Sequence, residues 1–454
     1  MNNNTKIETQ IHFSYPFSKL QQIAEDILKQ AKKGGASACE THISDGFGQT
    51  VTVRKNAVET IEYNRDKSLS VTVYIDRRRG NASTSDFSLQ AISDTVAAAL
   101  SIARHTAEDD CAGLADIELM AKKFPDLDLY HPWDLSVESA IELAKNCEQA
   151  AFAVDRRITN SEGASISINE SQFVYANSLG FLGGYPYSRH TISCAAIAEQ
   201  GESKQRDYWY CVARNSKDLE PVANIGRKAG ERTVARLGAR KIDTCEVPVL
   251  FEAPVASSLI GHFSGAVSGG SLYRKSSFLL GSLGQQIFAQ DINIKESPHS
   301  PRGLASSTFD DEGVATVERN VVEQGVVKGY FLNSYSARKL GMQTTGNAGG
   351  VHNLQIYNDN PMDFSALLKN MGTGLLITEM MGHGVNSVTG DYSRGVSGFW
   401  VEQGEICYPV EEITIAGNLR KMYQGISAIG NDIIVRGSKQ SGSILIDCMT
   451  IAGN

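Results

Sequence analysis

A change of hydrophobic period within the first hundred residues narrows the possible folds more than any other feature. Apolar residues recur at helical spacing across 17–33, where Ser18 is placed to cap a helix and Gly34 to help end it. A second helical pattern covers about 89–106. Between the two, the chain alternates apolar and polar residues in short β-branched stretches, at 37–44, 49–54, 58–63 and 68–75. This order predicts an α/β opening unit.

Helix and strand patterns continue up to about residue 240. Ser136 is placed to cap an amphipathic helix at about 137–154. Strand patterns then run from 158 to 211, with Gly180, Gly183 and Gly184 as turn points. A last helix of this half is expected at about 219–237.

The sharpest boundary lies near 238–244, and the pattern beyond it is different. A strand at 247–251 and a small-residue helix at about 254–269 precede short strands joined by glycine turns, with one amphipathic segment at 418–429. The similar segments 322–326 and 401–405 each predict a hairpin with glycine in the turn. We therefore predict an α+β fold with an N-terminal α/β domain at 1–240 and a mostly antiparallel β domain with a few helices at 241–454.

Composition excludes several classes of protein. The net charge of −8 gives no general attraction for nucleic acid. No apolar run is long enough to cross a membrane, and the polar stretch 1–10 has no signal-peptide core. The eight cysteines are scattered singly, without a C-x-x-C pair, which is typical of buried thiols in a reducing compartment. We expect a cytoplasmic protein.

Known catalytic motifs are absent. The sequence has no P-loop, no dinucleotide-binding glycine motif and no G-x-S-x-G nucleophile elbow. A zinc site needs three or four converging ligands, two of them commonly one helical turn apart. None of the nine histidines has another at i+3, i+4 or i+5, and none is followed by glutamate. The sequence therefore contains no local metal motif.

Several separate segments resemble the TldD/PmbA family of peptidases, also known as modulators of DNA gyrase, on its PmbA (TldE) side. The similar segments are Y-R-K-S-S-F at 273–278, D-E-G at 311–313, G-D-Y-S-R-G at 390–395 and T-I-A-G-N-L at 414–419, with weaker ones at 127–132 and 156–160. The resemblance extends from about residue 17 to the end of the chain. It implies a metallopeptidase fold and peptide substrates.

The resemblance also shows what this chain lacks. TldD-type chains carry H-E-x-x-x-H on a helix and a later cysteine that completes a zinc site. Aligning on Leu259 and Gly261 places Glu252 and Ser257 at the two histidine positions and Ala253 at the position of the glutamate base. A serine is a poor zinc ligand and alanine cannot accept a proton. The segment 437–442, where the cysteine would fall, contains none.

The family resemblance thus implies a zinc-less subunit that binds no cofactor itself. A TldD-like partner in a heterodimer would hold zinc, with a homodimer as the alternative assembly. The implied substrates are short or unstructured peptides, including peptide-antibiotic precursors and an antitoxin. Two other functions stay open: a self-sufficient metallopeptidase whose ligands come from His262, His352 and His383, and a non-enzymatic module that binds peptides or a regulator.

Four residues are candidates for contact with a peptide. His262 ends the small-residue helix, where it is either a core histidine or a substrate contact. His383 lies in a glycine-rich loop that is either a plain turn or part of a cavity. Asp391 and Arg394 lie in another glycine-bounded segment. They are expected either to pair with each other or to bind a peptide carboxylate.

Overall fold

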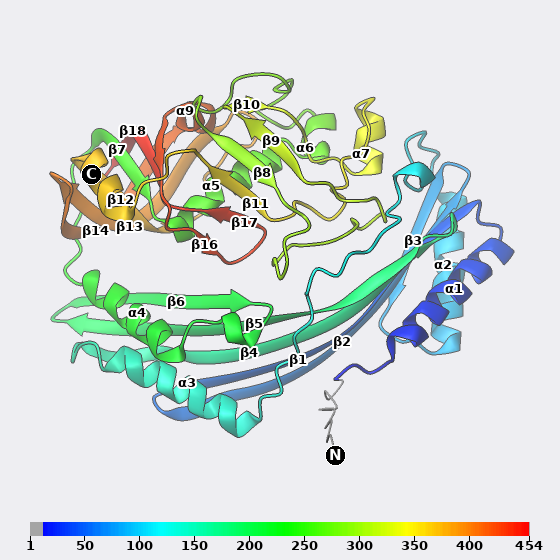
Figure 1. Cartoon of the computed structure of the whole chain (residues 1–454), viewed down its shortest axis with the longest axis horizontal. Helices are drawn as coiled ribbons and strands as arrows, with labels where there is room; N and C mark the ends of the chain where they lie inside the picture. Colours follow the sequence, from blue (N-terminus) through cyan, green and yellow to red (C-terminus); the bar gives the residue numbers. More distant parts are fainter. Residues whose placement is uncertain (1–11, 454) are drawn as a thin grey trace, which may run out of the picture.

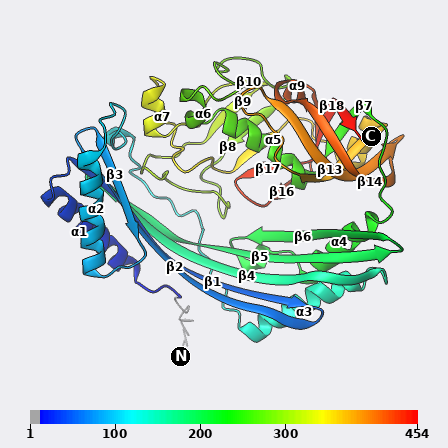
Figure 2. The same ribbon diagram turned by 180° about the vertical axis from the view of Figure 1, so that it is seen from behind.

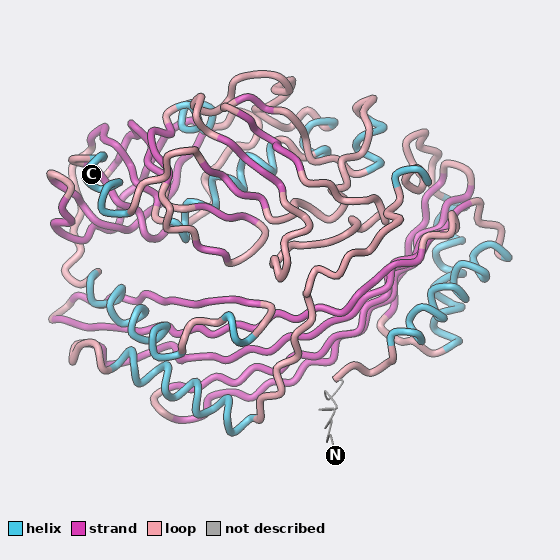
Figure 3. The backbone as a smooth tube through the Cα atoms, in the orientation of Figure 1, coloured by secondary structure: helices cyan, strands magenta, loops and turns pink. Residues whose placement is uncertain are grey.

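The computed structural model describes residues 12–453, so the stretch 1–10, expected to contain no signal peptide, lies outside the described residues. One long curved sheet is built from residues 38–213, and residues 245–452 form a second body over its concave face (Figure 1 and Figure 2). Figure 3 shows that this second body faces the sheet largely with loops. The α+β prediction is confirmed. No helix within 12–453 is long and apolar enough to cross a membrane.

The first sheet has six antiparallel strands in the order β3-β2-β1-β4-β5-β6. The four short strands expected between 37 and 75 are instead two long ones, because the polar stretches between them stay paired across the β1–β2 hairpin. Gly180 lies in the turn after β4, whereas Gly183 and Gly184 lie within β5. The strands are β1 Ala38–Arg54, β2 Ala57–Ile75, β3 Arg78–Thr84, β4 Ile158–Asn177, β5 Leu182–Gln200 and β6 Ser203–Ala213.

A buried carboxylate holds the tip of the β1–β2 hairpin. Lys55 and Asn56 form its two-residue turn, and both have positive φ angles. Their backbone N–H groups each donate to the carboxylate of Glu148 at 2.8 Å. Glu148 lies on a helix beneath the sheet and is 1% exposed. The turn of the long hairpin is thereby tied to the layer of helices.

Two pairs of helices cover the outer face of this sheet: α1 Phe17–Lys33 with α2 Leu89–His105, and α3 Val137–Phe152 with α4 Val222–Ala235. Ser136 caps α3 as expected, by accepting a hydrogen bond from the N–H of Ser139. Ser18 does not cap α1, because the helix begins at Phe17, after Pro16, and Ser18 already lies in its first turn. Helix α4 begins after Pro221, later than expected, because a proline disfavours helical geometry in the residue that precedes it.

Successive side chains of strand β1 point to opposite faces of the sheet, one toward the core and the other toward a cleft. Its odd-numbered residues Ile43 and Val51 are buried beneath the helices. Its even-numbered residues His42 and Ser44 line a cleft on the opposite face. One strand thus supplies both the core and a wall of the cleft.

The second body contains two further six-stranded sheets, in the orders β10-β9-β8-β11-β17-β16 and β14-β13-β12-β7-β18-β15. In the second of these, β18 pairs with both β7 and β14 and closes a barrel. The β7–β12 and β11–β17 pairs are parallel, and the other pairs are antiparallel. The strands are β7 Cys245–Phe251, β8 Asn293–Glu296, β9 Arg319–Glu323, β10 Val326–Val327, β11 Leu354–Tyr357, β12 Gly374–Met381, β13 Asp391–Glu402, β14 Glu405–Asn418, β15 Ile426–Ile429, β16 Ile434–Val435, β17 Lys439–Ser441 and β18 Ile444–Ala452. The helices are α5 Ala253–Ala266, α6 Gly269–Tyr273, α7 Ser334–Lys339, α8 Phe364–Met371 and α9 Leu419–Gln424.

Both predicted glycine-turn hairpins are present, as β9–β10 and β13–β14. Their turns are Gln324-Gly325 and Gln403-Gly404, and all four residues have positive φ angles. The expected amphipathic segment 418–429 is half helix and half strand, because α9 ends at Gln424 and β15 follows.

Side chains of helix α7 bind the segment that follows α2. Asp109 accepts hydrogen bonds from Lys339 Nζ at 2.8 Å and from the Tyr335 hydroxyl at 2.7 Å. Arg338 donates to the backbone carbonyls of Cys111 and Gly113. The hydrogen bond from Lys339, with those from the Cys111 N–H and Tyr335, lowers the pKa of Asp109 to about 2. These contacts tie the second body to one end of the first sheet.

Replacing Asp109 with Asn should lower the free energy of unfolding by about 0.5–1 kcal/mol at pH 7, the usual range for a partly exposed pair. A carboxyl whose pKa is depressed in the folded state stabilises above its unfolded pKa, near 3.9. The difference between wild type and Asp109→Asn should therefore be constant from about pH 8 to pH 4 and shrink as the pH approaches 2. Urea unfolding across this range tests it. Asp110→Asn is the control. An equal loss of stability in both variants would show that the contacts of Asp109 with Lys339 and Tyr335 do not stabilise the protein.

Candidate functional site

Glu252, at the first histidine position of the family motif, is committed to a contact between the two halves. It lies between β7 and α5, and both its carboxylate oxygens accept hydrogen bonds from Arg232 of α4, at 2.7 and 2.9 Å. Arg232 also lies 3.4 Å from the Asp207 carboxylate. Burial raises the pKa of Glu252, and the guanidinium of Arg232 partly offsets this. A carboxylate held in this way is not free to bind a metal.

The other two motif positions also lack the chemistry of a zinc site. Ala253 begins α5, and its backbone N–H donates to the Ser443 hydroxyl at 3.0 Å. The Ser257 hydroxyl donates to the Pro254 carbonyl of its own helix at 3.4 Å. The motif positions therefore supply no imidazole and no free base.

The segment 437–442 lies directly beside α5, where a third ligand would have to be. A hollow of about 300 Å³ is lined by Ser257 together with Arg436, Ser438 and Lys439. The Arg436 guanidinium stacks on Tyr210, with its carbon 3.9 Å from the ring centre. Two cationic side chains at this place repel a divalent cation. Within residues 12–453, no group of three His, Cys, Asp or Glu side chains is arranged to hold a metal ion. The residues present do not fit zinc.

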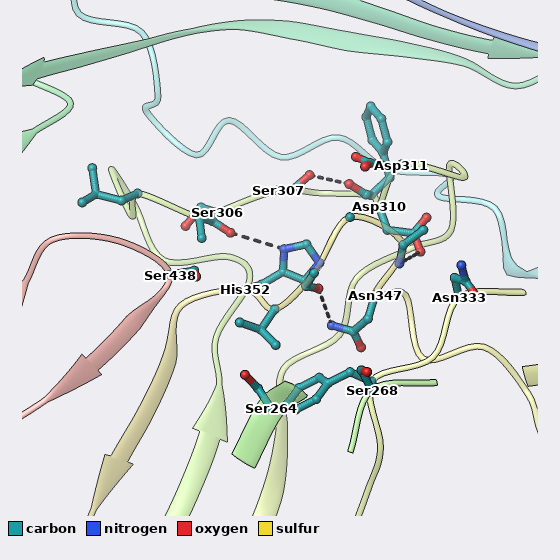
Figure 4. A pocket seen from close by; sticks show the side chains of 18 of the residues that line it. Ser264, Ser268, Ser306, Ser307, Asp310, Asp311, Asn333, Asn347, His352 and Ser438 are labelled. Atoms are coloured by element: carbon teal, nitrogen blue, oxygen red, sulfur yellow. Dashed lines mark hydrogen bonds between the residues drawn. The ribbon is translucent and has the colours of Figure 1, made fainter. Parts of the chain in front are cut away.

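A larger cleft of about 1030 Å³ lies between the curved sheet and the second body. His42, Phe173, Tyr185 and Tyr187 line it from the sheet. The opposite wall consists of the end of α5, the start of α6, and loops at 304–311 and 347–352, with Ser438 and Lys439 at one side. In Figure 4, His352 lies between Ser438 on one side and Asp310 and Asp311 on the other.

Two neighbouring aspartates in the cleft wall have different environments. The Asp310 carboxylate accepts hydrogen bonds from the backbone N–H groups of Glu312, Val314 and Ala348, each at 2.9 Å. Burial raises the pKa of Asp310 to about 7, against these bonds. Asp311 is exposed to the cleft, yet the surrounding protein raises the pKa of its carboxyl as well, while His42 and His352 act in the opposite direction. Asp310 thus fixes the loop that presents Asp311.

The candidate contacts are spread over separate places. His262 packs its ring edge-on to Tyr392 at 5.8 Å, and its Nε2 is buried with no hydrogen-bond partner among residues 12–453. Burial, and secondarily Arg394, lowers the pKa of His262. His383 and Asp391 line a different hollow of about 610 Å³, outside the main cleft.

The expected ion pair between Asp391 and Arg394 is not formed. Asp391 is held by the Thr389 hydroxyl at 2.7 Å and the Asn418 amide at 3.2 Å. Arg394 Nε donates to the Met381 carbonyl at 3.1 Å. Because the two residues are three apart on β13, their side chains leave opposite faces of the strand. They do not form one carboxylate-binding site.

His262, His352 and His383 do not converge. His352 lies in the wall of the main cleft, with Nε2 3.1 Å from the Gly346 carbonyl and Nδ1 3.3 Å from the Ala305 carbonyl. His383 lines the separate hollow beside β13, and His262 packs on Tyr392. A metal site shared by these three residues has no support in this geometry.

Family models match three successive parts of the chain. They are described as PmbA/TldA metallopeptidase domain 1, at 39–103, the central domain, at 130–237, and the C-terminal domain, at 244–453. A relative named metalloprotease PmbA, from Escherichia coli O157:H7, is 48% identical over 96% of both chains. The chain belongs to the PmbA/TldA metallopeptidase family. A PmbA homologue from Haemophilus influenzae is also 48% identical over 96% of both chains.

Two solved structures share the fold of this chain. A Bacteroides thetaiotaomicron protein, described provisionally as a modulator of DNA gyrase, matches with a TM-score of 0.90 at 27% identity, covering 96% of this chain and 99% of that one. TldE from Thermococcus kodakarensis matches with a TM-score of 0.83 at 19% identity, covering 95% of this chain and all of that one, and supports the fold alone. The resemblance seen in the sequence is confirmed.

Sequence reasoning missed the cleft residues of this PmbA/TldA chain. Asp311 belongs to the D-E-G segment that resembles the family, but nothing in the sequence around it indicates that it lines a cleft. His42 lies in a strand stretch where its polarity is unremarkable, and only pairing with β4 and β5 brings it beside the cleft aromatics. The sequence contained one signal for His42, which is that it alternates with the apolar positions of its strand and so should point away from the core.

Replacing Arg232 with Met should lower the free energy of unfolding by about 3–5 kcal/mol, because it leaves the carboxylates of Glu252 and Asp207 buried without their shared cation. The control is Arg227→Met on the same helix, which removes an exposed pair with Glu231 and should cost less than about 1 kcal/mol. Urea unfolding measures both. Equal losses for the two variants would show that the Glu252 contact is not structural.

Proposed function

We propose that this chain is the PmbA-type subunit of a two-subunit metallopeptidase, in which a TldD-like partner supplies the zinc ion and the general base. One observation carries the proposal: at the place of the family's metal motif, this chain has an Arg232–Glu252 ion pair, an alanine, a serine and two flanking cations. Such a site neither binds a divalent cation nor removes a proton from water. Membership of a metallopeptidase family therefore points to chemistry on another subunit.

What this chain contributes is a peptide-binding surface. The cleft volume of about 1030 Å³ is at the upper end of the range for ligand pockets and suits a peptide of several residues. Its lining mixes aromatic rings with serine hydroxyls, asparagine amides and backbone groups, which suits an extended peptide that carries its own donors and acceptors. The substrates we infer are short or unstructured peptides, such as peptide-antibiotic precursors and antitoxins. A folded domain does not fit a cleft of this size.

The same cleft favours a second candidate, a peptide-binding module that acts without any catalytic partner. This alternative predicts peptide binding with no cleavage in any mixture. We further propose a cytoplasmic location, since all eight cysteines are free thiols. With the net charge of −8, any influence on DNA gyrase would be indirect rather than through binding to DNA.

Metal analysis and peptide cleavage should be measured on this chain alone, on a TldD-like subunit alone, and on their mixture. We expect no stoichiometric zinc and no cleavage with this chain alone, and cleavage in the mixture with zinc following the TldD-like subunit. Size-exclusion chromatography with light scattering tells a heterodimer from a homodimer. Zinc binding and turnover by the isolated chain would contradict the proposal, and binding without cleavage in the mixture would favour the peptide-binding module.

A further inference from the structure

The main cleft contains two side chains of opposite charge for which the described part of the chain, 12–453, provides no bonding partner. Within residues 12–453, neither the Asp311 carboxylate nor the Lys439 ammonium takes part in a hydrogen bond or an ion pair. This contrasts with the other charged groups nearby: Asp310 is bound by three backbone N–H groups, and Arg214 donates to the carbonyls of Ser188 and Leu304. A charge facing a cavity without a partner is available to a ligand.

The surroundings of Asp311 suit a cation. The facing wall presents His42, whose ring stacks on Phe173 at 5.4 Å, and the rings of Tyr185 and Tyr187. Burial lowers the pKa of His42, and the nearby charge of Asp311 partly offsets this. Aromatic faces beside a carboxylate attract ammonium and guanidinium groups. The bonds to Asp310 hold the loop, so Asp311 is presented in a fixed position.

The surroundings of Lys439 suit an anion. Lys439 is on β17 and lines both the main cleft and the adjoining hollow beside α5. Lys439 lies beside α5, because its Cε would be in ordinary contact, at 3.7 Å, with a Cβ placed on Gly261. Arg436 lines the same hollow and adds a second positive charge. In Figure 4, Ser438, the neighbour of Lys439, lies on the opposite side of His352 from Asp311.

We propose that the cleft binds a short peptide in one direction, with a cationic group of the peptide against Asp311 and an anionic group against Lys439. The cation is either the α-ammonium group or a lysine or arginine side chain, and the anion is either the C-terminal carboxylate or an acidic side chain. The proposal rests on the peptide-binding role inferred above, but it requires neither zinc nor a partner subunit. Opposite charges at the two ends select both the charge pattern and the orientation of the peptide.

Isothermal titration of the full chain, alone, tests this with four alanine-based pentapeptides. One has both termini free, one is N-acetylated, one is C-amidated, and one is N-acetylated but begins with lysine. The free peptide should bind, and blocking either terminus should weaken binding about tenfold. Recovery of affinity by the acetylated lysine peptide identifies a side chain as an accepted cation, and no recovery identifies the α-ammonium group as the required one.

Two variants test which residue binds which end of the peptide. Asp311→Asn should weaken binding of the free peptide about tenfold and leave binding of the N-acetylated alanine peptide unchanged. Lys439→Met should weaken binding of the free peptide and leave binding of the C-amidated peptide unchanged. Asp359→Asn and Lys33→Met, which change exposed residues outside the cleft lining, are the matched controls. Thermal melting should be the same for all four variants, because neither cleft side chain bonds to any other residue in the described range 12–453.

No binding of any peptide by the wild-type chain, or equal binding of all peptides by wild type and both cleft variants, would overturn the inference. These failures are separable from failure of the proposed function. Cleavage by the mixture with zinc on the partner can be present while charge-dependent binding is absent, and the reverse can also hold. As a further check, Asp311→Lys should reverse the preference and favour a peptide with an acidic first residue.

Discussion

The two-residue period of the long strands is the constraint on which the rest of the molecule depends. On β1, β4 and β5, residues of one parity are buried under the helices, as Ile43, Ile166 and Ile192 are. Residues of the other parity face the second body. The register pairs Ser44 with Phe173 and Phe173 with Tyr185, so one row of side chains crosses three strands and becomes a wall of the cleft. A slip of one residue would exchange core and cleft together.

The second body is held over this wall by polar contacts. One of them engages Glu252, the residue at the first histidine position of the family motif. Arg232 of α4 and Arg236, which directly follows this helix, pair with Glu252 and Glu379 of the second body, while Asp207 lies near both arginines. Glu252 cannot serve both this network and a metal. The hollow beside α5 is lined by Lys439 and Arg436, and these two positive charges disfavour a divalent cation there.

In the proposed two-subunit enzyme, binding and catalysis would be divided between the subunits. A subunit that lacks metal ligands can carry positive charge where a zinc-binding chain must carry ligands, and its cleft can be shaped for recognition alone. The loops around 304–311 and 347–352 are fixed to each other through Asp310, which holds the wall of the cleft in place where Asp311 faces it. Pre-organisation of this kind reduces the entropy lost on binding.

The sequence by itself determined the α+β class, the positions of α1, α2 and α3, the two glycine-turn hairpins, and the absence of a zinc motif, because each depends on residues close together in the chain. Only the tertiary structure decided that four strand patterns form two long strands, that α9 is short, and that Asp391 and Arg394 do not pair. It also decided the cleft, which joins His42, Asp311 and Lys439 from three distant parts of the chain. Strand register and the packing of one body on another are set by contacts between residues far apart in sequence, and no local period encodes them.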